Sequence, residues 1–151
     1  MPTARLSMRW GSEPPVDQRC YVGINDTRPE EQTVQRPARV LVVEDEMLFA
    51  ETLVGLLQDG GFSAAGPTAT VAGALSILAT CAIDAAILDV RLDHERSDRV
   101  AYALQDRDIP FIFVTACPRR DLPLDLRSRP WIEKPFHPPA LLHRLREVLP
   151  A

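Results

Sequence analysis

Lysine and cysteine are scarce in this chain of 151 residues, and long apolar runs are missing. The three cysteines, Cys20, Cys81 and Cys117, are odd in number and never at CxxC spacing, which indicates neither a disulfide framework nor a zinc site. No run approaches the roughly 18 apolar residues of a membrane span. The N-terminus also lacks the apolar core of a signal peptide. We therefore expect a cytoplasmic protein that does not contact a membrane.

The sequence also lacks a cluster of basic residues. The formal net charge is -4, and no run of basic residues could form an electrostatic footprint for nucleic acid. We therefore expect no direct DNA binding. Lys134 is the single lysine beside sixteen arginines, a bias that is typical of the coding genome but that makes the position of this lysine informative.

Residues 1–37 differ from the rest of the chain. They are rich in proline and charge and show no sustained apolar period, which predicts a disordered or loosely docked N-terminal extension. The regular pattern that follows predicts one domain over residues 38–151. No second domain is expected after it.

Strand and helix patterns alternate along this domain. Apolar runs typical of strands lie at 40–43, 62–66, 85–90, 111–116 and 131–132. Apolar residues at helical spacing follow at 46–59, 71–78, 97–104 and 141–149. Region 117–130 holds three prolines, so any helix there should be short, around 121–127. This order predicts an α/β fold, (βα)5 and doubly wound, with a five-stranded parallel sheet.

Polar residues stand where four of these strands end. Glu44 and Asp45 follow the first strand, Asp89 the third, Thr115 the fourth and Lys134 the fifth. Because ligands bind outside the carboxyl ends of parallel strands, we expect these five side chains to form one site.

The residue types at this edge favour phosphoryl chemistry. Crowded carboxylates raise each other's pKa unless a cation such as Mg²⁺ binds them through oxygen. A lysine and a hydroxyl complete a pocket for a phosphoryl group, and an aspartate beside them can act as a nucleophile. Taken alone, Glu44, Asp45 and Glu46 could equally be a solvated helix start, and Asp89 a turn-capping acid. Glu46 keeps that simpler interpretation.

The motifs VLVVEDE, LDV, FVTA and EKPF occur in this order. Together they resemble the receiver domain of two-component response regulators over about residues 38–150. The resemblance implies a flavodoxin-like receiver fold. It also implies Mg²⁺ as cofactor, bound by Glu44, Asp45, Asp89 and the backbone carbonyl of Arg91.

The same resemblance assigns the remaining roles. Asp89 is expected to be the phosphoacceptor, and Thr115 and Lys134 are expected to contact the phosphoryl oxygens. The Lys134–Pro135 peptide bond is expected to be cis. Trp131 stands where many receivers carry a rotating Tyr or Phe, which makes it a switch candidate.

The segments LDVRLDHERS and PFIFVTA resemble stand-alone alphaproteobacterial receivers with a degenerate fourth helix. The expected function is therefore that of a single-domain response regulator and not of an enzyme. It would accept a phosphoryl group from a histidine kinase or histidine phosphotransfer protein and signal by protein contact or phosphate relay. The sequence names neither the kinase nor the downstream partner.

Two other functions stay open. A Mg²⁺-dependent phosphohydrolase with an aspartate nucleophile would need a second acid two residues after Asp89, where Arg91 stands. A pseudo-receiver would work as an unphosphorylated interaction module, with residues 1–38 as one candidate surface. The complete set of five site residues disfavours this second alternative.

Overall fold

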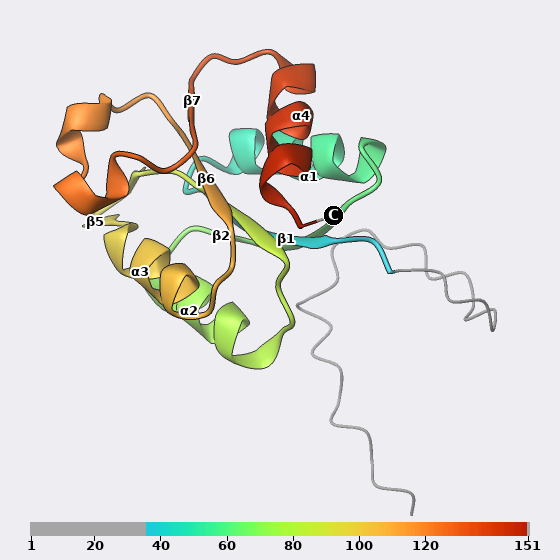
Figure 1. Cartoon of the computed structure of the whole chain (residues 1–151), viewed down its shortest axis with the longest axis horizontal. Coiled ribbons are helices and arrows are strands. Elements are labelled where there is room, and N and C mark those ends of the chain that lie inside the picture. The colour runs from blue at the N-terminus through green and yellow to red at the C-terminus, as the bar shows by residue number, and fades with distance from the viewer. Residues whose placement is uncertain (1–35, 151) are drawn as a thin grey trace, which may run out of the picture.

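The computed structural model describes residues 36–150 (Figure 1). Almost all of the predicted extension, residues 1–37, lies outside the described residues. The five-stranded parallel sheet is confirmed, in the order β2-β1-β3-β6-β7. Its strands are β1 (Arg39–Val43), β2 (Ser63–Thr68), β3 (Ala85–Leu88), β6 (Phe111–Thr115) and β7 (Trp131–Glu133). The helices are α1 (Met47–Asp59), α2 (Val71–Thr80), α3 (Asp98–Asp106) and α4 (Pro138–Val148).

Helices cover both faces of the sheet, which explains the uninterrupted apolar strands (Figure 1). Val40 and Val42 of β1 belong to the core cluster that α1 and α4 cover. Leu41 and Val43 alternate with them and belong to the cluster that α2 and α3 cover. All four side chains are fully buried, as the period of two residues along a strand requires.

The helices begin and end close to the predicted positions. In α1 the buried stripe is Leu53, Val54 and Leu57 beside Ala50, and the helix stops before Gly60. Two prolines occupy the first turn of α4, where a missing N–H costs little. Serine is a common helix cap, but Ser97 at the N-cap position of α3 makes no side-chain capping bond, and its hydroxyl donates to the carbonyl of Val90 instead.

Two features differ from the predicted pattern. A short antiparallel hairpin, β4 (Arg91–Leu92) and β5 (Glu95–Arg96), follows β3 where the sequence indicated only a loop. The fourth crossover contains two single 3₁₀ turns, Arg119–Asp121 and Leu124–Leu126, in place of one short helix. Prolines interrupt this crossover and remove the N–H groups that an α-helix needs.

Side chains give the fourth crossover its order. Leu122 and Leu126 are buried beneath it. Arg127 donates from Nε to the carbonyl of Leu122 and from a terminal nitrogen to that of Arg120. The segment 117–130 is therefore a folded loop that packs on the sheet.

Among residues 36–150, every helix is too short or too polar to cross a lipid bilayer.

Candidate functional site

Backbone hydrogen bonds fix the polar residues at the carboxyl edge of the sheet. The amide of Asp89 donates to the carbonyl of Val43 at 3.0 Å, which ties the end of β3 to β1. The amide of Lys134 donates to the carbonyl of Thr115 at 2.9 Å, which ties the end of β7 to β6. The Lys134–Pro135 peptide bond is cis, as predicted. These bonds thus hold the side chains of neighbouring strand ends together at the carboxyl edge of the sheet.

Asp89 lies at the centre of this group. The hydroxyl of Thr115 donates to its Oδ1 at 2.7 Å, and the ammonium of Lys134 donates to its Oδ2 at 2.9 Å. Thr115 is fully buried and Asp89 is nearly so. The amide of Cys117 in turn donates to the Thr115 hydroxyl oxygen at 3.2 Å, which orients that hydroxyl toward Asp89. Each carboxylate oxygen of Asp89 therefore has its own fixed donor.

Glu44 shares the lysine with Asp89. Its Oε2 accepts a hydrogen bond from Lys134 at 2.6 Å, and its Oε1 accepts one from the amide of Glu46 at 3.1 Å. Burial outweighs these contacts and raises the pKa of Glu44 to about 7. Burial alone would lower the pKa of Lys134, but hydrogen bonds to Glu44 and Asp89 raise it overall. Lys134 therefore stays charged near neutral pH.

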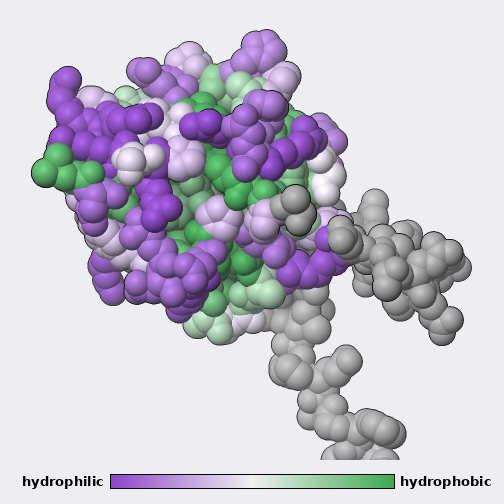
Figure 2. Space-filling model, in the orientation of Figure 1, coloured by the Kyte–Doolittle hydropathy of each residue, from purple (hydrophilic) through white to green (hydrophobic). Residues whose placement is uncertain are grey.

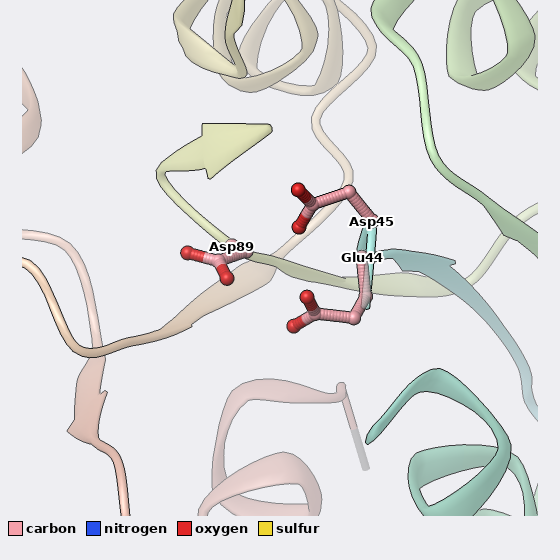
Figure 3. Close-up of side chains that lie close together, drawn as sticks. All are labelled: Glu44, Asp45 and Asp89. Atoms are coloured by element: carbon pink, nitrogen blue, oxygen red, sulfur yellow. The ribbon is translucent and has the colours of Figure 1, made fainter. Parts of the chain in front are cut away.

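Glu44, Asp45 and Asp89 form an acidic cluster whose ligand oxygens all lie within 4.8 Å of one another. Figure 3 shows Glu44 and Asp45 reaching from the end of β1 toward Asp89 at the end of β3. Asp45 is the most exposed of the three. Clustered carboxylate oxygens suit a hard cation such as Mg²⁺. Glu46 is outside the cluster and occupies the N-cap position of α1 without a side-chain capping bond.

Phe49 was missed by the sequence analysis. It lies in the first turn of α1, and the Lys134 ammonium sits 4.0 Å from the centroid of its ring. The available signal was an aromatic residue one helical turn after the acid pair, where it can face the same edge of the sheet.

Trp131 lies on β7 away from the acidic cluster. It is half-buried, and its ring packs against Phe113 with centroids 5.9 Å apart. The guanidinium of Arg119 lies 5.6 Å from its ring centroid. These contacts connect Trp131 to the segment 117–130, and its switch role stays a prediction.

The β4–β5 hairpin connects Asp89 to the same segment. Arg91, whose carbonyl was predicted as a metal ligand, forms a salt bridge with Asp121 at 3.2 Å. Arg96 donates to the backbone carbonyl of Asp121 at 2.6 Å and pairs with Asp98. Asp93, in the turn of the hairpin, is exposed. The residues directly after the central aspartate therefore hold the fourth crossover.

A family model described as response regulator receiver domain matches residues 40–146. The chain belongs to this family. Such receivers are signalling modules of two-component systems, and members typically carry an acidic pocket for Mg²⁺. A comparison with curated proteins finds no significant match.

Solved structures of receivers are similar over most of the described chain. SdrG from Sphingomonas melonis Fr1 is 39% identical with a TM-score of 0.67, and the match covers 75% of this chain and 97% of SdrG. A BeF3-activated conformation of SdrG, from Pseudomonas melonis Fr1, gives a TM-score of 0.64 at 39% identity, covering 74% and 96%. The receiver domain of PhyR from Erythrobacter litoralis is 28% identical with a TM-score of 0.67, covering 74% and 89%. The receiver fold predicted from the sequence is therefore confirmed.

Proposed function

We propose that this receiver domain accepts a phosphoryl group on Asp89 from a histidine kinase or a histidine phosphotransfer protein. The observation that carries this proposal is the convergence of two donors on one carboxylate. The Thr115 hydroxyl and the Lys134 ammonium each bind a different oxygen of Asp89, at 2.7 Å and 2.9 Å. In this proposal, the same two donors bind the oxygens of a phosphoryl group once it is attached there.

The transfer is a displacement at phosphorus. A carboxylate oxygen of Asp89 attacks the phosphorus of phosphohistidine and forms a new O–P bond, which gives an acyl phosphate. The P–N bond breaks, and its electron pair stays on the imidazole nitrogen. Lys134 and Thr115 donate hydrogen bonds to the transferred oxygens, and the fixed backbone at the strand ends keeps these donors in position.

The acidic cluster fits Mg²⁺, because it offers carboxylate oxygens from three residues within 4.8 Å. Glu44, Asp45 and Asp89, with the backbone carbonyl of Arg91, would hold the ion. When bound, Mg²⁺ neutralises negative charge on the phosphoryl group. Without the ion, Glu44 and Asp89 together hold the Lys134 ammonium in the pocket.

The output of this reaction is proposed to be protein contact or phosphate relay, and the domain assists only its own phosphorylation and dephosphorylation. Thr115 ends β6 shortly before the segment 117–130, whereas Lys134 follows β7, which begins where this segment ends. Arg91 and Arg96 hold the same segment from the other side. In this proposal, a phosphoryl group that draws Thr115 toward itself acts on the start of this segment.

A small-molecule phosphodonor tests the proposal. We expect the protein to gain the mass of one phosphoryl group when acetyl phosphate and Mg²⁺ are added, and Asp89→Asn to gain none. Asp93→Asn is the matched control, because Asp93 lies four residues away with a side chain that is 78% exposed. This variant should be modified like the wild type.

Two results would contradict the proposal. Equal labelling of the wild type and Asp89→Asn would place the phosphoryl group elsewhere. An unlabelled wild type, with both acetyl phosphate and a panel of phosphorylated histidine kinases, would favour the unphosphorylated interaction module.

A further inference from the structure

Phe49 makes a contact that the receiver motifs do not include. Its ring centroid lies 4.0 Å from the Lys134 ammonium, which is within the distance at which a cation is attracted by the face of an aromatic ring. The Lys134 side chain is only 16% exposed. Partial removal from water strengthens such an interaction.

We propose that Phe49 is a positioning residue, which holds the Lys134 ammonium at Asp89 and so supports phosphoryl transfer. This inference rests on the proposed function, because it concerns the lysine that would bind the phosphoryl oxygens. Phe49 itself touches neither Asp89 nor the transferred group in this role.

The donors of Lys134 show why a third contact matters. An ammonium has three N–H groups. Glu44 and Asp89 accept from two of them. Over residues 36–150, the remaining contact of the nitrogen is the Phe49 ring. Because the attraction of a ring face does not depend on the direction of one N–H bond, the ammonium can turn toward phosphoryl oxygens without leaving the ring.

Phe49 is held rigidly enough to act in this way. Its ring meets that of Phe136 edge to face, with centroids 5.8 Å apart and an angle of 88° between the planes. Phe136 comes two residues after Lys134 in the chain, and both rings pack against the core cluster under α1 and α4. The ring therefore connects the first turn of α1 to the loop that carries the lysine.

An ordinary apolar contact is the competing explanation, and substitutions separate the two. Phe49→Leu keeps an apolar side chain but removes the aromatic face, whereas Phe49→Tyr keeps the face. Phe62→Leu is the matched control. Phe62 packs against the same core cluster and lies 5.8 Å from the Arg146 guanidinium, but it precedes β2 at the opposite edge of the sheet.

The first measurement needs no phosphorylation. Because Lys134 is the only lysine in the sequence, labelling lysine with carbon-13 at Cε gives one side-chain signal from the intact chain in an NMR spectrum. We expect the Lys134 Hε protons to be shifted upfield by the ring current of Phe49. The shift should be lost in Phe49→Leu and kept in Phe49→Tyr and Phe62→Leu.

The second measurement is the rate of phosphorylation by acetyl phosphate with Mg²⁺. We expect Phe49→Leu to react about 5- to 30-fold more slowly, the factor that corresponds to the loss of one partly buried cation–π contact. Phe49→Tyr should restore the rate, and Phe62→Leu should leave it unchanged. Thermal unfolding of all three variants shows that they are folded.

The outcomes separate this inference from the proposed function. An unlabelled wild type would contradict the proposed function, whatever the NMR signal shows. A labelled wild type with an equally fast Phe49→Leu variant would overturn the positioning role alone. A folded Phe49→Tyr variant that stays as slow as Phe49→Leu, or a Lys134 signal that does not respond to Phe49→Leu, would also overturn it.

Discussion

Glu44 is the residue at which the acidic cluster and the lysine meet. Only 3% of this residue is exposed, and both of its carboxylate oxygens accept hydrogen bonds. Burial raises its pKa to about 7 from an ordinary value of 4.5. Near neutral pH, Glu44 thus changes between a proton-bound form and a carboxylate that can bind a cation.

The stability of the Mg²⁺-free protein should therefore depend on pH through Glu44. Its raised pKa favours the fold fully below about pH 4.5, and this contribution is lost as the pH rises through about 7. We expect Glu44→Gln to gain stability relative to the wild type between these values, by on the order of 1–3 kcal/mol. Urea unfolding of both proteins across this range in the presence of a chelator measures the difference.

Two comparisons make this result specific to Glu44. Lys134 does not interfere, because its pKa is raised from 10.5 and its contribution is lost only as the pH rises through that still higher value. Glu51→Gln, on the exposed side of α1, should show no such trend relative to the wild type. If the difference in the free energy of unfolding between Glu44→Gln and the wild type stays constant with pH, burial does not raise the pKa of Glu44.

The segment 117–130 shows how an element can be ordered without regular structure. Leu126 is fully buried beneath it, whereas Leu124, two residues earlier, is 79% exposed. Figure 2 shows hydrophobic atoms that protrude from a largely hydrophilic surface where this segment lies in Figure 1. The segment therefore depends on a small number of buried contacts.

A matched pair of substitutions tests this dependence. We expect Leu126→Ala to lower the free energy of unfolding by about 2–4 kcal/mol, since it leaves a cavity in the core. Leu124→Ala should change it by less than about 0.5 kcal/mol, since the side chain is in water. Chemical denaturation of both variants gives the two values. Similar losses from both would mean that the segment is packed differently from the structure described here.

Sequence patterns predicted the elements in which apolar residues repeat at a regular spacing. They did not predict features that depend on side-chain contacts between distant segments of the chain. The sheet and its strand-end residues were predictable because β1, β3 and β6 are continuous apolar runs. The hairpin after Asp89 was not, because its strands have two residues each and no alternation to detect. Proline predicted a short fourth helix but not its division into two 3₁₀ turns.

The same limit applies to the site. Glu44, Asp89 and Lys134 could be predicted together because parallel strands end at one edge of the sheet. The contact between Phe49 and Lys134 could not, since it depends on how the first turn of α1 meets the loop after β7 and on the rotamers of two side chains. The raised pKa of Glu44 likewise follows from its depth in the fold and not from its neighbours in sequence.

At the scale of the whole molecule, the site joins the two faces of the sheet. Phe49 belongs with the core cluster under α1 and α4, whereas the segment tied to the β4–β5 hairpin buries Leu122 and Leu126 in the cluster under α2 and α3. Asp89 and Lys134 lie at the edge between these clusters and are joined directly by a salt bridge. Asp89 is therefore connected through Lys134 and Phe49 to one half of the core, and through the β4–β5 hairpin to the other.

This arrangement predicts an uneven distribution of local stability. Amides of Val42 and Ile87, which lie on paired central strands covered on both faces, should exchange with solvent only through global unfolding. Amides of Asp121 and Leu126 donate to carbonyls only three residues earlier and should exchange faster, through local opening. Hydrogen exchange followed by NMR compares the four amides.

Leu126→Ala should increase the exchange rate of the Asp121 amide more than that of the Ile87 amide. Equal protection at all four amides would instead show that the segment 117–130 unfolds together with the sheet. The segment could then not respond to phosphorylation of Asp89 by opening locally.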